Sequence, residues 1–304
     1  MKLALFVLLG VFGVLYVTVL AAAVLRARRL GDRGGQQAVP TLFETALGFV
    51  TSFFDTLGIG SFAPTTAVLK LRNLVPDEKI PGTLNVGHTL ATIAQAYIFI
   101  TIVKVELNTL VLMILAAVLG SWFGAGFVAK ASRRKIQLGM GLALLAAATL
   151  FLLKIFDVTP AGGATESLVG WKLAAGFAGN FALGALMEVG VGLYGPCMIL
   201  VSLLGMTPIA AFPIMMGSCA FLMPVGSVKF IQKDRYSLRT TLGLAIGGVP
   251  AVLLAAFIVK SLPLTAMRWL VVIVVLYAAL SMLRSAASEA KMVAAPAPVP
   301  SPLP

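Results

Sequence analysis

Residues 55–64 read DTLGIGSFAP and interrupt an apolar run that is otherwise long enough for a membrane helix. The stretch places a carboxylate, two glycines and a proline where a spanning helix would keep its backbone hydrogen bonds unbroken. Glycine allows backbone conformations that end a helix, and proline suits the first turn of the helix that follows. We therefore expect two half-helices that meet at Gly58 and Gly60, with the second one beginning at Pro64.

The composition is that of an integral membrane protein. The 304 residues are 60% hydrophobic and 11% charged, with a mean hydropathy of +1.02, which leaves too little polar surface for a water-soluble globule. The apolar runs are continuous rather than alternating, which indicates helices and not barrel strands. The sequence has no P-loop, HExxH or GxSxG motif, so we predict neither an enzyme nor nucleotide-driven transport, and no cofactor.

Nine apolar segments are present, at about 3–25, 41–71, 80–103, 108–129, 136–156, 171–204, 207–228, 240–260 and 265–283. Two of them, 41–71 and 171–204, are too long for one span and too short for two. If both dip into the bilayer and return, 17 of the 23 basic residues fall on the same side, as the positive-inside rule requires. We therefore predict seven spans and two re-entrant hairpins in the inner membrane, with the N-terminus outside and the C-terminus cytoplasmic. The net charge of +12 lies mostly in short loops, so no nucleic-acid partner is predicted.

The two broken segments align at a constant offset of 132 residues. GIGSFAP at 58–64 matches GVGLYGP at 190–196, and Pro81 matches Pro213. We therefore expect Pro196 to begin a second half-helix as Pro64 does. In the proposed topology the two units have opposite orientations, a common construction in transporters that bind substrate near the midplane. The predicted units are a first helix and basic loop at 1–36, repeat 1 at 37–156, repeat 2 at 157–285, and a proline-rich disordered tail at 286–304.

Polar side chains gather near the proposed hairpin tips and in the segment 80–103. A helix that begins at such a break presents free N–H groups and the positive end of its dipole, which suits an anion. Asn85 and His88 share one helical face with Thr89 and Thr92, and Gln95 lies in the same segment. We expect this polar stripe to face a cavity.

Three ionisable side chains, Asp55, His88 and Glu188, lie inside apolar segments, where a charge is costly and therefore marks a functional candidate. Asp55 and Glu188 stand three and two residues before their glycines, which suggests a role common to both halves. They either carry a coupling proton, cap the facing backbone amides, or are neutral acids that serve structure. His88 either takes part in substrate or proton binding or is a satisfied packing residue.

The stretches GFVTSFFDTLGIGSFAPTTAVLKL at 48–71 and GALMEVGVGLYGPCMILVSLLG at 184–205 resemble the TauE/SafE family, also called the toluene sulfonate uptake permease family. The resemblance covers about residues 41–285 and implies a secondary transporter of sulfur-containing anions such as sulfite, sulfoacetate or other sulfonates. Many members carry GIGGG at the first hairpin, where this chain reads GIGSF. The substrate-binding residues that we predict are Gly58, Gly60, Ser61, Thr65, Thr66, Asn85, His88, Gly190, Gly192, Tyr194 and Ser218.

Two other functions remain open from the residues. Cys197 and Cys219 would serve a transmembrane thiol redox carrier if they lie close together. Six of the twelve methionines fall between Met187 and Met223, and methionine with cysteine suits Cu(I), which makes a copper transporter the other alternative. We predict no resident metal, and the predicted partners are a small anion, the lipid bilayer and, as an alternative to a monomer, a second copy of the chain.

Overall fold

The structure is a computed structural model that describes residues 2–30, 39–158, 163–190, 192–258, 272–273, 276, 279–280 and 282–288. The described residues form helices and no strand, so the predicted all-α fold is confirmed. Within them, four helices are long and apolar enough to cross a membrane, which makes the chain a multi-pass membrane protein. The count of seven spans stays a prediction.

The helices follow the predicted apolar segments closely. Both broken segments contain two short helices, and the predicted spans from 3–25 to 240–260 each coincide with one helix, whose ends differ by a few residues. The segment 265–283 lies mostly outside the described residues, as do residues 31–38 and the tail from 289. The elements are α1 (Lys2–Leu30), α2 (Leu42–Thr56), α3 (Phe62–Leu71), η2 (Asp77–Lys79), α4 (Ile80–Ile102), α5 (Leu107–Val128), α6 (Arg133–Ile155), α7 (Gly170–Met187), α8 (Tyr194–Leu203), η3 (Pro208–Ala210), α9 (Ala211–Gln232) and α10 (Leu238–Ile258).

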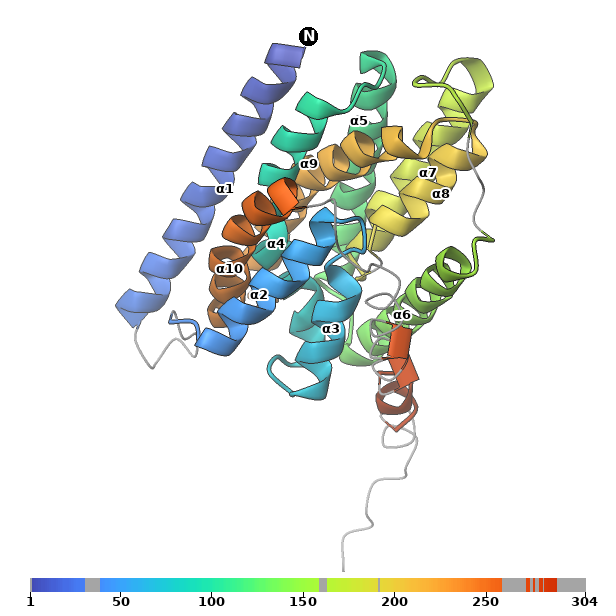
Figure 1. Ribbon diagram of the computed structural model, residues 1–304. Helices are drawn as coiled ribbons and strands as arrows, with labels where there is room; N and C mark the ends of the chain where they lie inside the picture. The colour runs from blue at the N-terminus through green and yellow to red at the C-terminus, as the bar shows by residue number, and fades with distance from the viewer. Residues whose placement is uncertain are drawn as a thin grey trace, which may run out of the picture.

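The two broken segments enter the molecule from opposite ends. Figure 1 shows the α2–α3 hairpin rising from the lower end and the α7–α8 hairpin descending from the upper end, so that their breaks lie near the centre. Helix α2 packs on α10 and α7 packs on α5, while α4 and α9 pack on each other between them. The contacts are repeated in the two halves: α2 corresponds to α7, α4 to α9 and α10 to α5. The contacts of α10 with α2 and α4 thus correspond to those of α5 with α7 and α9. The inverted repeat stays an interpretation, because the last segment of the second unit is mostly undescribed.

Glycines allow the two outer pairs of helices to approach closely. A Cβ atom at Gly247 of α10 would overlap the backbone of Thr45 in α2, and one at Gly120 of α5 would overlap the backbone of Phe181 in α7. In a bilayer, where burying apolar surface gives helices little drive to associate, such small-residue contacts supply the packing. The frame that holds both hairpins is therefore fixed by backbone contact.

Ion pairs join the loops that carry the basic clusters. Lys70 after the first hairpin contacts Asp77 at 2.7 Å, and Arg133 at the start of α6 lies 3.7 Å from the same carboxylate. Arg239 of α10 contacts Glu44 of α2 at 3.0 Å. The ends of the first hairpin, α6 and α10 are thereby tied together.

Candidate functional site

The two helix breaks have similar backbones at their first glycine. Gly58, Gly60 and Gly190 have φ angles of 81°, 89° and 102°, a region that disfavours every residue with a Cβ atom. We expected the second half-helices to begin at their prolines, and this was wrong by two residues. Proline occupies the third position of α3 and of α8, where its missing N–H has no intrahelical partner in any case.

The starts of α3 and α8 are free of side-chain caps. Ser61 and Leu193 stand at the N-cap positions, and neither makes a capping hydrogen bond. The first bonds of the two helices run from the Thr65 N–H to the Ser61 oxygen, at 3.0 Å, and from the Cys197 N–H to the Leu193 oxygen, at 2.9 Å. The N–H groups before them have no intrahelical partner, so both helix starts can bind an anion.

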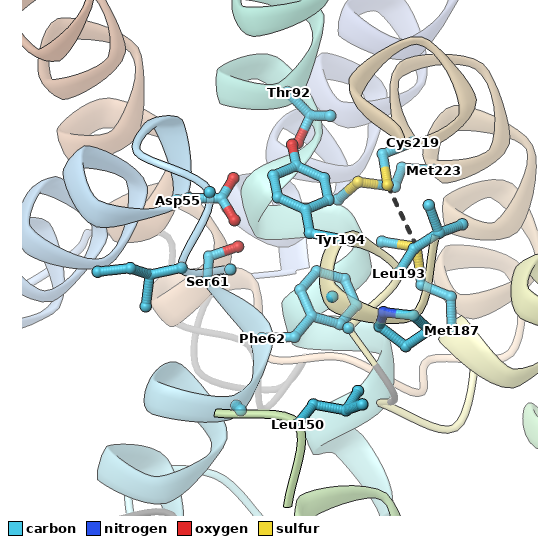
Figure 2. Close-up of a pocket in the computed structure, with 17 residues that line it drawn as sticks. Asp55, Ser61, Phe62, Thr92, Leu150, Met187, Leu193, Tyr194, Cys219 and Met223 are labelled. Atoms are coloured by element: carbon cyan, nitrogen blue, oxygen red, sulfur yellow. Dashed lines mark hydrogen bonds between the residues drawn. The ribbon is translucent and has the colours of Figure 1, made fainter. Parts of the chain in front are cut away.

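A cavity lies between the two breaks, with about 730 Å³ of space free of protein atoms, part of it open to solvent. Figure 2 shows Asp55 and Ser61 on one side of Tyr194, and Met187, Cys219 and Met223 on the other. The described lining residues include no lysine and no arginine. They are Asp55, Gly58, Ile59, Gly60, Ser61, Phe62, Ala63, Thr92, Leu150, Met187, Gly192, Leu193, Tyr194, Gly195, Pro196, Cys219 and Met223.

Gln95 of α4 connects the two hairpin tips behind the cavity. Its Nε2 donates to Asp55 Oδ2 at 2.9 Å and to Thr56 Oγ1 at 3.0 Å, and its Oε1 accepts from the Tyr194 hydroxyl at 2.6 Å. The sequence placed Gln95 and Thr92 in the polar segment, but neither was predicted to be a site residue. The helical face that they share with His88 was the available signal.

His88 lies beside the cavity without lining it. Its Nδ1 is 3.3 Å from Ser52 Oγ in α2, and its Nε2 is 3.1 Å from Thr65 Oγ1 in α3. Both ring nitrogens are therefore occupied, and the ring bridges the two arms of the first hairpin. This geometry favours the packing role over direct contact with a substrate. The buried hydroxyl of Thr66 does not line the cavity either.

Glu188 is fully buried in a separate network, away from the cavity lining. Asn85 Nδ2 donates to its Oε2 at 2.8 Å, and Ser121 Oγ lies 2.6 Å from its Oε1 and 3.2 Å from the Leu222 carbonyl oxygen. A serine hydroxyl has a single proton. If Glu188 is protonated, it donates to Ser121, which then donates to Leu222, and both contacts are satisfied. If Glu188 is ionised, only one of them is.

The remaining predicted residues lie elsewhere. Ser218 of α9 accepts a hydrogen bond from Asn180 Nδ2 at 3.0 Å, outside the cavity lining, and Gly190 faces Met140 of α6. Both cysteines are buried free thiols, and only Cys219 lines the cavity. Of the predicted binding residues, the structure brings Gly58, Gly60, Ser61, Gly192 and Tyr194 to the cavity. It places Thr65, Thr66, Asn85, His88, Gly190 and Ser218 away from its lining.

The fold is that of a helical membrane protein built around two interrupted helices, and the site lies between the two breaks. Residues 2–151, which span α1 to most of α6 and make up just under half of the chain, match the family model described as sulfite exporter TauE/SafE. This match supports the family that the hairpin motifs indicated. Members of this family are transporters rather than enzymes. Comparisons with curated proteins and with solved structures gave no match.

Proposed function

We propose that the protein is a secondary transporter of a small sulfur-containing anion of the sulfite, sulfonate or sulfoacetate type. The observation that carries the proposal is the opening of two uncapped helix starts, α3 and α8, onto one cavity. Their N–H groups can bind an oxyanion without a buried cation. The hydroxyl protons of Thr92 and Tyr194 are already donated to the His88 carbonyl oxygen and to Gln95 Oε1, so the helix starts themselves provide the donors. The family match supports a sulfur-containing substrate.

We further propose that Asp55 couples anion binding to a proton. Its carboxyl group lines the cavity, so an ionised Asp55 would repel the substrate. At a separation of about 5 Å and an effective dielectric constant of about 20, that repulsion is about 3 kcal/mol, or roughly a hundredfold in affinity. A proton on Asp55 removes the repulsion, so anion and proton bind together. The direction of transport then follows the combined gradients of the two.

The proposed transport cycle is alternating access at the two hairpin tips. Gln95 joins Asp55 of one tip to Tyr194 of the other, so movement of either hairpin changes the cavity. We place the protein in the inner membrane with the ion-paired loops on the cytoplasmic side and the N-terminus outside. The abundance of basic residues at these loops is the support for this orientation.

The experiment is a thermal-shift screen of the purified protein against sulfite, thiosulfate, sulfonates and carboxylates at low and neutral pH. A ligand that binds only the folded protein raises the unfolding temperature. We expect stabilisation by a sulfur-containing anion, stronger at the lower pH. Stabilisation by carboxylates alone, or by none of these anions, would contradict the proposal.

A further inference from the structure

Three sulfur atoms gather on the wall of the cavity that faces away from Asp55. They belong to Met187 at the end of α7 and to Cys219 and Met223 of α9, all of which line the cavity (Figure 2). The Cys219 thiol donates to the Met187 thioether across 3.6 Å. Cys219 and Met223 are four residues apart, so they project from the same face of α9.

The distance between the sulfur atoms of Cys219 and Met187 fits a shared metal ion. With metal–sulfur bonds of about 2.3 Å, as in zinc thiolates, two sulfurs in a trigonal arrangement lie about 4 Å apart. The separation of 3.6 Å between Cys219 Sγ and Met187 Sδ therefore needs to open by only a few tenths of an ångström. Cys219 and Met187 are almost fully buried, so their sulfur atoms do not compete with bulk water for a ligand.

The chemistry of these ligands selects soft cations. Thiolate and thioether sulfur favour Cu(I) and similar ions, whereas Mg²⁺ and Ca²⁺ prefer oxygen. The described residues contain no group of three histidine, cysteine, aspartate or glutamate side chains that could hold a metal, but two thioethers and one thiol do not require such a group. The lining also includes Asp55 and no lysine or arginine among the described residues, so a cation meets no repulsion there.

We propose that Met187, Cys219 and Met223 form a binding site for a soft monovalent metal ion of the Cu(I) or Ag(I) class. Binding breaks the S–H bond of Cys219, forms a sulfur–metal bond and releases one proton to solvent, while the two thioethers bind through lone pairs. The site shares the cavity with the proposed anion site but does not depend on it. A failure of anion binding therefore leaves this proposal standing, and the reverse also holds.

The test is calorimetric titration of the purified full-length protein with silver nitrate in chloride-free buffer. We expect one tightly bound Ag(I) per chain. Cys219→Ser should weaken binding by at least about tenfold, and Met187→Leu or Met223→Leu by several-fold. Cys197→Ser is the matched control, because Cys197 is also a buried free thiol but does not line the cavity, and it should bind silver as the unmodified protein does.

A second measurement separates a three-sulfur site from a single reactive thiol. In the Cys197→Ser background, silver should protect Cys219 from a maleimide, and the double variant Met187→Leu/Met223→Leu should lose most of that protection. Leucine for methionine conserves volume, so this variant keeps the test valid even if Cys219→Ser does not fold. Equal silver affinity with and without the methionines, or equal losses in Cys197→Ser and Cys219→Ser, would overturn the proposal.

Discussion

The two helix breaks share a backbone plan and differ in what they do with their acidic residue. Each has a glycine with positive φ, Gly58 or Gly190, and a proline at the third position of the half-helix that follows. Asp55 of the first break lines the cavity, whereas Glu188 of the second is packed among α4, α5 and α9. The two acidic residues stand at similar positions before their glycines, but one is in contact with the cavity and the other is enclosed by protein.

One backbone arrangement, used twice, therefore holds two kinds of site. Phe62 and Tyr194 begin α3 and α8 at matching positions, but only Tyr194 has a hydroxyl, and it reaches Gln95 from the opposite hairpin. The second break supplies this hydroxyl and the first supplies the carboxyl. The cavity is therefore asymmetric although its frame is repeated, and the following substitutions test that asymmetry.

The largest effect is expected from exchanging the acids for amides. In Asp55→Asn, anion binding should become independent of pH, exceed that of the unmodified protein by roughly a hundredfold at high pH, and no longer support uptake driven by a proton gradient. Glu188→Gln should keep gradient-driven uptake, because an amide can still accept from Asn85 and donate to Ser121. Uptake by proteoliposomes at several pH values measures both. A pH dependence that survives in Asp55→Asn would remove Asp55 from the coupling.

The next effect concerns the link between the tips. Tyr194→Phe makes the second half-helix begin as the first one does, and it leaves the buried Gln95 Oε1 without its donor at 2.6 Å. An unpaired buried acceptor costs about 1–3 kcal/mol, so we expect lower thermal stability together with weaker anion binding. Phe62→Tyr on the first hairpin is the control for a change of ring chemistry alone. Unchanged stability in Tyr194→Phe would mean that the tips are not coupled through Gln95.

A smaller effect is expected at the second glycine of the first break. Gly60 has a φ of 89°, and no neighbouring atom lies within 4 Å of the place that a Cβ atom would take, so Gly60→Ala tests backbone strain alone, about 1–2 kcal/mol. Thermal unfolding measures this loss, and Gly192→Ala, where a Cβ atom would lie 3.9 Å from Phe62 Cβ in an ordinary contact, is the comparison at the second break. An unchanged unfolding temperature in Gly60→Ala would mean that the first break holds no such strain.

The smallest expected effect on stability is at the start of α5, which has a side-chain cap, unlike the starts of α3 and α8. Glu106 caps α5 by accepting from the N–H groups of Thr109 and Asn108, and these bonds, first that of Thr109, lower its pKa. A lowered folded-state pKa means that the contribution is present above the unfolded pKa of about 4.3 and is lost as the pH falls through the folded value. Glu106→Gln should cost less than about 1 kcal/mol at neutral pH and show a weaker loss on acidification.

Thermal unfolding between neutral and acidic pH measures this contribution. Ser132→Ala at the start of α6 is the control, because the Ser132 side chain makes no capping bond and its removal should leave stability unchanged. If Glu106→Gln and the unmodified protein lose stability in parallel on acidification, the cap does not contribute.

Much of the architecture was predictable from local patterns. The predicted hairpins at 41–71 and 171–204 correspond to Leu42–Leu71 and Gly170–Leu203, because apolar length and the Gly-x-Gly with proline act on the chain where they stand. Helix ends were less accurate: α9 runs from Ala211 to Gln232, so it begins and ends four residues later than the predicted segment 207–228. The turn η3 at Pro208–Ala210 is apolar, so hydropathy alone does not separate it from the helix that follows.

Within the site, the breaks were predictable and the contacts were not. Glu188 and Asp55 looked equivalent from their spacing to a glycine, but the packing of α4, α5 and α9 around Glu188 separates them. Asn85 and His88, which we expected at the substrate, are engaged by Glu188 and by Ser52 with Thr65. The helical stripe correctly indicated a buried polar face, but it did not indicate which groups would satisfy one another.

The helical membrane fold and its two interrupted segments follow from the order of residues alone, because hydrophobic length and glycine and proline chemistry are local properties. Which groups share the cavity follows only from the packing of the helices. Gln95 and Tyr194 are 99 residues apart in the chain and hydrogen-bonded in the fold. Such a contact depends on how distant helices cross. Close crossings, such as those of α2 with α10 and of α5 with α7, place a glycine of one helix against the backbone of another, and no local pattern pairs these positions in advance.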